Sequence, residues 1–128
     1  MVVFITSFKE AKMHNRPNPQ SIARWQPKGF DYPELQMLAP FREDGSPILW
    51  KQMGPDQYKD EYMKAIGSRF YDQIRPWLQQ LKATEDVSLC CWCDETRTWC
   101  HGTIVGRIIE STRPDIDVVY LAGRPGVF

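Results

Sequence analysis

The sequence predicts an α/β fold: one domain over residues 1–128, with a mostly parallel central sheet of about four strands, flanking helices and a long irregular loop. Segments rich in β-branched and other apolar residues predict strands at residues 2–8, 21–25, 87–93 and 116–122. In the second half of the chain, helical segments alternate with the strands. Such crossover connections join parallel strands, and 128 residues are the size of one domain.

The first half begins with residues 2–8, whose alternation predicts a strand. Residues 9–20 are polar and contain two prolines, which predicts a loop. A short strand follows at residues 21–25 and ends before Pro27. Residues 26–55 contain five prolines and three glycines without a regular period, so we expect a long ordered loop. This loop either has a function or braces a sheet edge through its aromatic residues Phe30, Phe41 and Trp50.

The second half carries the clearest helix, at residues 57–82. Apolar side chains recur there at spacings of three and four: Tyr58, Tyr62, Ile66, Phe70, Ile74, Trp77 and Leu81. Pro76 either kinks this helix or begins a second one. Residues 87–93 contain few charges, as expected of a strand buried on both faces. A second helix is expected from about residue 103 to 111, before the last strand.

Composition excludes some classes of protein. Basic and acidic residues number 16 each, so no net charge attracts the chain to nucleic acid or to anionic membranes. No run of 18 apolar residues is present, and the first residues lack the basic region and cleavage site of a signal peptide. Four clustered cysteines without a secretory signal favour a reducing compartment and argue against a framework of disulfides. We therefore expect a cytoplasmic protein, which includes the cytoplasm of an infected cell if the protein is viral.

The most informative segment is residues 87–107. All four cysteines and one of the two histidines fall within twelve of its residues. The segment is predicted to be a strand, a polar loop and a helix start, which is where α/β proteins commonly bind ligands. The candidate zinc ligands are separated by gaps of one, six and zero residues: Cys91, Cys93, Cys100 and His101. Zinc ribbons use gaps of two to four within each ligand pair, so we predict no metal and no cofactor.

One interpretation of this segment is nucleophilic catalysis. Cys100 would stand at the entry of a helix, where backbone N–H groups and the helix dipole lower the pKa of a thiol. His101 would then act as its base. Neither the arginine spacing of a tyrosine-phosphatase loop nor a Cys-x-x-Cys redox pair is present. The sequence thus allows a thiol-dependent enzyme without naming its class.

A second interpretation is anion binding. The turn Cys100–Thr103 would offer backbone amides and the Thr103 hydroxyl to a phosphate or carboxylate, and Gly102 would let the ligand approach the backbone. Arg97, Arg107 and Arg124 could add positive charge. Cysteines on a core strand need no function, however, and simple burial also explains them.

The order of these residues resembles the domain-of-unknown-function family 488, over roughly residues 2–122. A first strand ending in Thr6-Ser7-Phe8, a second strand Ser21–Arg24 followed by Pro27, and a Cys-x-Cys strand leading to Cys100-His101 carry the resemblance. Members are small cytoplasmic α/β proteins of bacteria, archaea and phages, with no settled activity. They typically have arginine after the Cys-His pair, where this chain has Gly102. The resemblance implies that five residues converge at the carboxyl ends of three strands: Ser7, Arg24, Cys93, Cys100 and His101.

The leading hypothesis is therefore a cytoplasmic protein that binds a small anionic ligand, such as a nucleotide or a nucleotide-derived signal. Its pocket would be formed by the Cys100–Thr103 turn, Ser7, Arg24 and the aromatic loop 26–55. Arg24 would neutralise the anion, and the indole of Trp25 or Trp92 would stack on the ring.

A thiol-dependent enzyme with Cys100 as nucleophile and His101 as base is one alternative. A protein or nucleic-acid interaction module is another, because the first quarter of the chain has a basic lean: Lys9, Lys12, Arg16, Arg24 and Lys28. No membrane partner is expected. The sequence determines neither the ligand nor the oligomeric state.

Overall fold

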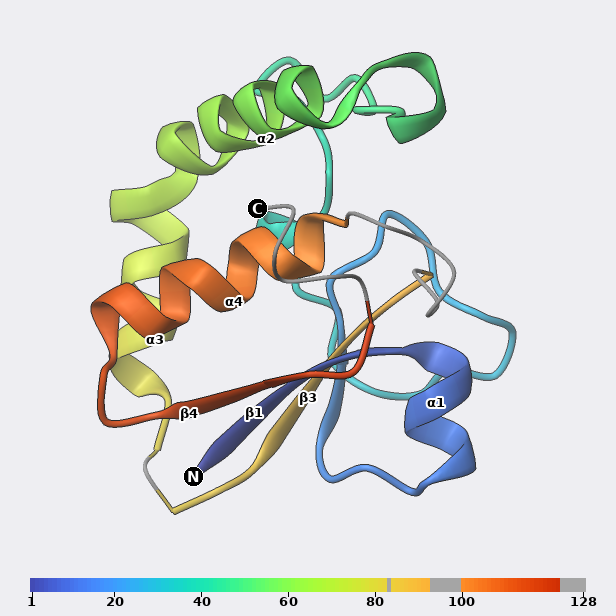
Figure 1. The fold of residues 1–128 in the computed structure, drawn as a ribbon, viewed down its shortest axis with the longest axis vertical. Coiled ribbons are helices and arrows are strands. Elements are labelled where there is room, and N and C mark those ends of the chain that lie inside the picture. The colour runs from blue at the N-terminus through green and yellow to red at the C-terminus, as the bar shows by residue number, and fades with distance from the viewer. Residues whose placement is uncertain (83, 93–99, 123–128) are drawn as a thin grey trace.

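A computed structural model describes residues 1–82, 84–92 and 100–122. It confirms the α/β fold class: one domain with a four-stranded, all-parallel sheet in the order β2-β3-β1-β4 (Figure 1). The strands are β1 (Val2–Ser7), β2 (Pro19–Ser21), β3 (Val87–Cys91) and β4 (Asp117–Tyr120). No helix among the described residues has the length and apolar character needed to cross a membrane.

The central strands are β1 and β3, and their register brings chemistry-bearing residues together. Ser7 pairs with Cys91 at the carboxyl ends of these two strands. Ser21 pairs with Cys90, and the next N–H, of Ile22, donates to the Cys90 carbonyl at 2.9 Å. The segments that follow β1, β2 and β3 therefore all leave the sheet at the carboxyl ends of the strands. Parallel sheets usually bind their ligands at this end.

Helices cover both faces of the sheet. The larger core lies under α2 (Pro55–Arg69) and α4 (His101–Thr112), and contains Ile5, Leu89 and Tyr62. The predicted helix over residues 57–82 is not continuous, because a π-helical segment, Phe70–Ile74, separates α2 from α3 (Arg75–Gln80). Pro76 lies in the first turn of α3, where its missing N–H costs no hydrogen bond. Of the two predicted roles for Pro76, the start of a new helix is thus the observed one.

Two expectations for the first half are wrong. The segment predicted as a loop at residues 9–20 begins as helix α1 (Phe8–Met13), on the other face of the sheet. The Ser7 hydroxyl caps this helix by accepting the Glu10 N–H at 3.1 Å. The strand predicted at residues 21–25 lies earlier, at Pro19–Ser21, because the chain turns away after pairing with β3.

The long loop follows β2, the outer strand of the sheet, and side chains of α2 hold it in place. Its Pro33 carbonyl accepts the Ser21 N–H, and its Leu35 N–H donates to the Ser21 carbonyl. Backbone bonds to residues 33–35 thus cover this edge of the sheet, and Phe30 packs against the small core cluster that contains Phe8 and Cys90. Two short 3₁₀ turns interrupt the loop, at Gln36–Leu38 and Trp50–Gln52.

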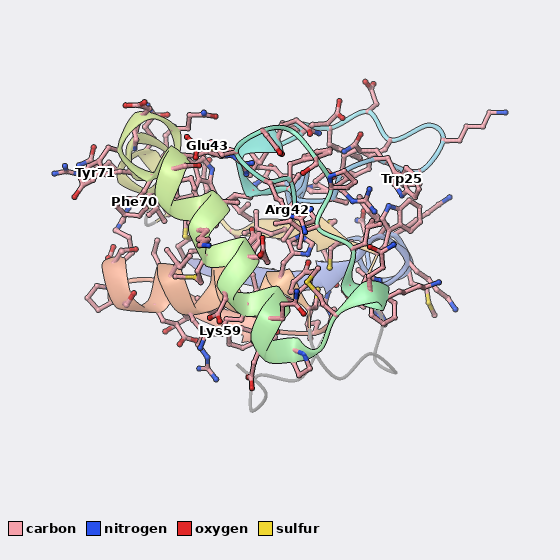
Figure 2. All side chains as sticks on the ribbon, turned by 90° about the horizontal axis from the view of Figure 1, so that it is seen from above. Trp25, Arg42, Glu43, Lys59, Phe70 and Tyr71 are labelled. Atoms are coloured by element: carbon pink, nitrogen blue, oxygen red, sulfur yellow. The ribbon has the colours of Figure 1, made fainter. Side chains whose placement is uncertain are left out.

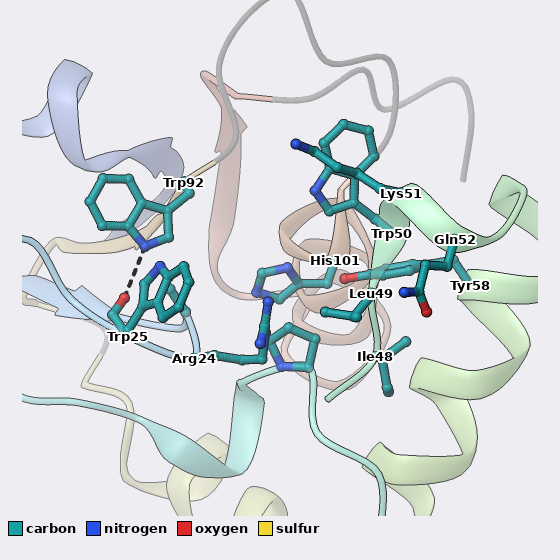
Figure 3. A pocket seen from close by; sticks show the side chains of 12 residues that line it. Arg24, Trp25, Ile48, Leu49, Trp50, Lys51, Gln52, Tyr58, Trp92 and His101 are labelled. Carbon is teal, nitrogen blue, oxygen red and sulfur yellow. Dashed lines mark hydrogen bonds between the residues drawn. The ribbon is translucent and has the colours of Figure 1, made fainter. Parts of the chain in front are cut away.

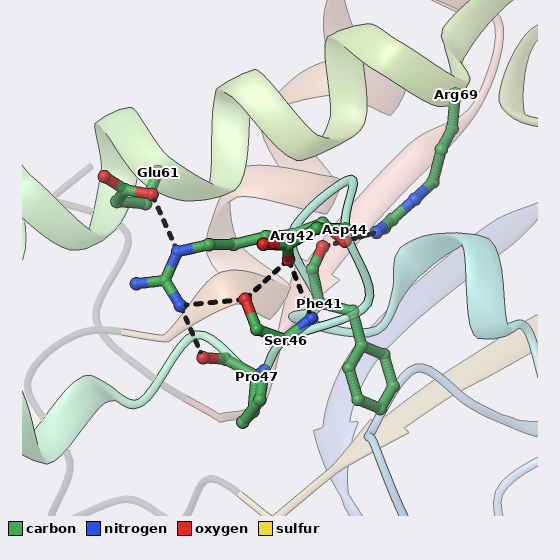
Figure 4. A network of polar contacts seen from close by, with 7 residues as sticks. All are labelled: Phe41, Arg42, Asp44, Ser46, Pro47, Glu61 and Arg69. Carbon is green, nitrogen blue, oxygen red and sulfur yellow. Dashed lines mark hydrogen bonds and ion pairs between the residues drawn. The ribbon is translucent and has the colours of Figure 1, made fainter.

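A polar network holds the middle of this loop. Arg42 bonds Glu61 on α2 at 3.1 Å and donates to the Pro47 carbonyl at 2.8 Å (Figure 4). Arg69, at the end of α2, donates to four loop carbonyls, those of Met37, Ala39, Phe41 and Arg42. The loop is therefore a fixed part of the fold over these residues.

Candidate ligand-binding site

A cavity of about 670 Å³ opens at the carboxyl edge of the sheet (Figure 3). Five parts of the chain meet there: the segment after β2, the long loop, the first turns of α2, the residue after β3 and the first residue of α4. The lining residues come from all of them: Ala23, Arg24, Trp25, Pro40, Ile48, Leu49, Trp50, Lys51, Gln52, Tyr58, Trp92 and His101. Of the residues that the sequence predicts for a site, four meet at this one pocket: Arg24, Trp25, Trp92 and His101.

Three half-exposed indoles frame the pocket. Trp25 is 63% exposed, Trp92 49% and Trp50 38%. The Trp92 indole N–H donates to the Trp25 carbonyl at 3.0 Å, and the Trp92 ring packs on Phe8 with centroids 4.8 Å apart. Indoles are usually buried much further, so a cluster of exposed ones leaves flat apolar faces that a ligand ring can cover.

The charge in the pocket is positive. Arg24 and Lys51 both line it, and none of the described lining residues is acidic. The Arg24 guanidinium lies 5.4 Å from the Trp25 ring centre, and the Lys51 ammonium lies 5.8 Å from that of Trp50. Each cation is thus paired with an indole face, an arrangement that suits a ligand combining a flat ring with negative charge.

His101 forms the floor of the pocket and is only 5% exposed. Its Nε2 lies 2.8 Å from the Ile22 carbonyl oxygen. Because a carbonyl only accepts, Nε2 must carry the proton of this hydrogen bond. In the neutral ring the lone pair is then on Nδ1, which lies 4.0 Å from Cys100 Sγ. The backbone after β2 thus fixes the orientation of the imidazole.

Cys100 is fully buried and does not line the pocket. Its sulphur caps α4 by accepting the Gly102 N–H at 3.4 Å. Cys100 is disulfide-bonded, whereas Cys90 and Cys91 are not. The sequence argument against a framework of disulfides did not anticipate the bond of Cys100. The predicted site residue Cys93 lies outside the described residues, as do Arg97 and Arg124.

Three other predicted ligand-binding residues are engaged elsewhere. Gly102 faces β1, since an added Cβ would lie 2.9 Å from Ile5 Cγ2, so its role is close packing. Thr103 is buried, its N–H donates to the Cys100 carbonyl, and its hydroxyl has no partner in the described part of the chain. Ser7 caps α1. None of the three lines the cavity. The N–H groups of Gly102 and Thr103 bond to Cys100 within the first turn of α4, and the Ser7 hydroxyl bonds to Glu10.

Sequence reasoning did not single out Lys51, Gln52 or Tyr58 as ligand-binding residues. The first two belong to the long loop, whose composition indicated order but not which side chains face the sheet. Tyr58 belongs to the apolar stripe of α2 and was assigned to the core; it is fully buried and also contributes to the wall of the pocket. The available signal was an aromatic, a cationic and an amide residue in succession, Trp50-Lys51-Gln52, within a loop that has no regular period.

Comparison with protein-family models, with curated proteins and with solved structures found no match for this chain. The resemblance to family 488 therefore stays a prediction. Within the described residues, no three His, Cys, Asp or Glu side chains are grouped to hold a metal ion.

Proposed function

We propose that this protein binds a small ligand that combines a flat ring with negative charge, and that the ligand is a nucleotide or a molecule derived from one. The observation that carries the proposal is the pocket itself, in which two cations and three half-exposed indoles surround a buried histidine. Its volume, about 670 Å³, falls in the range of roughly 300–1,000 Å³ common for small-molecule sites.

The pocket offers a distinct role to each kind of side chain. The indole faces of Trp25, Trp50 and Trp92 would stack on the ring. Arg24 and Lys51 would neutralise the phosphate, and this replaces the anion-binding role predicted for the Cys100–Thr103 turn. The Gln52 amide, which both donates and accepts, could bond the polar edge of a base.

The alternative functions receive less support from the same geometry. A nucleophile must reach its substrate, whereas the Cys100 sulphur is fully buried, outside the pocket lining and already bonded to another sulphur. The excess of basic residues in the first quarter is the argument for a nucleic-acid partner. It is weakened because the Arg16 guanidinium is paired with the Glu10 carboxylate, with Nη2 and Oε1 2.6 Å apart. Both alternatives stay predictions, but neither has a feature comparable with the pocket.

The test is calorimetric titration with the four nucleoside monophosphates, the matching nucleosides and inorganic phosphate. Arg24→Gln removes one of the two pocket cations. Its control is Arg75→Gln, because Arg75 likewise lies over an aromatic ring, that of Tyr71, although Arg75 is exposed and Arg24 is half-buried. Figure 2 shows Tyr71 and Trp25 at opposite ends of the molecule, so the control is remote from the pocket.

We expect saturable binding of at least one monophosphate. Arg24→Gln should weaken it about tenfold, the loss of roughly 1.4 kcal/mol expected for one charge-assisted contact. Arg75→Gln should leave it unchanged, and the nucleoside should bind more weakly than its monophosphate. Absence of saturable binding at millimolar concentration, or equal affinity in the two arginine variants, would refute the proposal.

A further inference from the structure

The pocket repeats one combination of side chains, an indole with a cation over its ring, on two of its walls. On the first wall the Arg24 guanidinium lies 5.4 Å from the Trp25 ring centre. On the second wall the Lys51 ammonium lies 5.8 Å from the Trp50 ring centre. Figure 3 shows Trp25 and Trp50 on different sides of the pocket. The first pair follows β2 and the second belongs to a 3₁₀ turn of the long loop, so separate parts of the chain hold the two pairs.

The first wall is a fixed platform. Trp92 stands beside Trp25, and its indole N–H donates to the Trp25 carbonyl at 3.0 Å. The Trp92 ring packs on Phe8 with centroids 4.8 Å apart, and Phe8 in turn packs edge-on against Phe30 at 5.3 Å. Because these contacts hold the Trp92 ring and the Trp25 backbone before a ligand binds, stacking on this wall costs little conformational entropy.

One nucleotide can use only one of the two pairs. It has one base to stack and one sugar-linked phosphate group to neutralise, whereas each wall supplies both a ring face and a cation. No carboxylate is among the described residues that line the pocket, so a chain of phosphates that crosses from one wall to the other meets no like charge there. The repeated pairs therefore fit a ligand that itself repeats a base and a phosphate.

We propose that the pocket holds two nucleotides joined by a phosphodiester, with one base against each wall. The inference rests on the proposed function and names the ligand class of the same site. Arg24 and Lys51 then serve different phosphates rather than one. Joining the nucleotides makes the second contact intramolecular, so the linked ligand binds more tightly than either half alone. A free dinucleotide and the end of a single strand of nucleic acid share this chemistry.

The experiment is calorimetric titration with the four 5′-phosphorylated homodinucleotides, pApA, pGpG, pCpC and pUpU, each compared with its own monophosphate. We expect at least one dinucleotide to bind about tenfold more tightly than its monophosphate, or better, with one dinucleotide per chain. A dinucleotide that used only one wall would gain no more than a statistical factor of about two, because either of its bases could occupy that wall.

Lys51→Gln separates this inference from the proposed function. It should weaken binding of the dinucleotide about tenfold, but change the affinity for the monophosphate, which needs only the first wall, by less than about twofold. Arg24→Gln should weaken binding of both ligands. The matched control is Lys64→Gln, because Lys64 is also exposed but lines a separate cavity beside Arg42 and Glu61. This control should change neither affinity.

Two results would overturn the inference and leave the proposed function standing. One is a set of dinucleotides that all bind within about twofold of their own monophosphates, which is the statistical gain alone. The other is a Lys51→Gln variant that loses affinity for both ligands equally, since both cations would then act on one phosphate. Absence of saturable binding by every nucleotide would overturn the inference and the proposed function together.

Two further probes distinguish the sources of the dinucleotide unit. They are the linear tetranucleotide and the cyclic 3′–5′ dinucleotide of the base that binds best. A tetranucleotide that binds as tightly as the dinucleotide supports the proposal and identifies the end of a single strand as the source. A cyclic dinucleotide that binds while the tetranucleotide is excluded supports it equally and identifies a free dinucleotide.

Discussion

Arg69 is the side chain that fastens the long loop to α2, and Arg69→Lys tests this directly. The guanidinium donates to the carbonyls of Met37 at 3.3 Å, Ala39 at 3.4 Å and Arg42 at 3.2 Å, and makes a shorter bond to Phe41. Lysine keeps the charge and has nearly the same helix propensity, but its ammonium lacks the planar fork that spans several carbonyls.

The expected cost follows from these four contacts. A good hydrogen bond from a charged donor contributes about 1.5–3 kcal/mol, but only one of the four is short and the side chain is half-exposed, so the whole set contributes about 2–3 kcal/mol. Lysine should recover one or two of the contacts. We therefore expect Arg69→Lys to lower the free energy of unfolding by about 1–2 kcal/mol, and the melting temperature by roughly 4–10 °C for a chain of this size.

The assay is urea unfolding followed by circular dichroism, with a thermal melt as a second readout. Arg75→Lys is the control, because Arg75 is exposed and contacts only the Tyr71 ring among the interactions found for it; its effect should stay within about 0.5 kcal/mol. If both variants unfold like the wild type, Arg69 does not brace the loop. If both fall equally, the loss comes from the helix rather than from the carbonyl contacts.

Two further predictions concern packing and charge. Gly106→Ala would place a Cβ 2.5 Å from Tyr120 Cε1, whereas Gly67→Ala meets nothing within 4 Å. By urea unfolding, Gly67→Ala should gain about 1 kcal/mol from helix propensity, and Gly106→Ala should lose that gain or more to overpacking; equal gains would contradict the close contact. Burial disfavours the charged form of Glu10, but hydrogen bonds, the largest from Arg16, outweigh it and lower the pKa of the carboxyl below 4.5. The advantage of the wild type over Glu10→Gln should therefore be present at pH 7 and shrink as the pH falls below that value, and an advantage of equal size at about pH 3 would contradict the pairing.

The sequence predicted the fold class because its strands are marked by composition. The apolar runs at residues 2–8 and 87–93, separated by a periodic helix, indicated parallel strands with a helical crossover, and the structure has this arrangement. The order of strands was not predicted, because it depends on which edges the turns reach. Placing β2 beside β3 rather than β1 needs the pairing of Ser21 with Cys90, a contact between residues distant in the sequence.

Helix α1 was missed because six residues are too few to show a period. Local chemistry nevertheless marked it: Ser7 and Glu10 have the spacing of a capping box, with serine at the cap and glutamate three residues later. The two prolines that suggested a loop, Pro17 and Pro19, lie beyond the end of the helix. In this segment a polar composition described the exposed face of a helix, while Phe8 and Ala11 supplied the buried face.

The candidate site was predicted in part, for a topological reason. Arg24, Trp92 and His101 each follow a strand or begin the next helix, so parallel pairing alone brings them to one edge. The loop was expected to contribute, but which of its residues do so could not be predicted, since the position of Lys51 depends on how Arg42 and Arg69 hold the loop against α2. Such contacts depend on the assembled fold and leave no local pattern.

His101 ties the pocket to the sheet. One ring nitrogen donates to the Ile22 carbonyl at 2.8 Å, the ring lines the pocket, and the other nitrogen lies 4.0 Å from the Cys100 sulphur. Ile22 follows β2 and donates its own N–H to the Cys90 carbonyl on β3, so the backbone group that holds the imidazole is itself held by the sheet. A ligand that contacts the floor of the pocket would therefore meet a side chain whose orientation the fold fixes before binding.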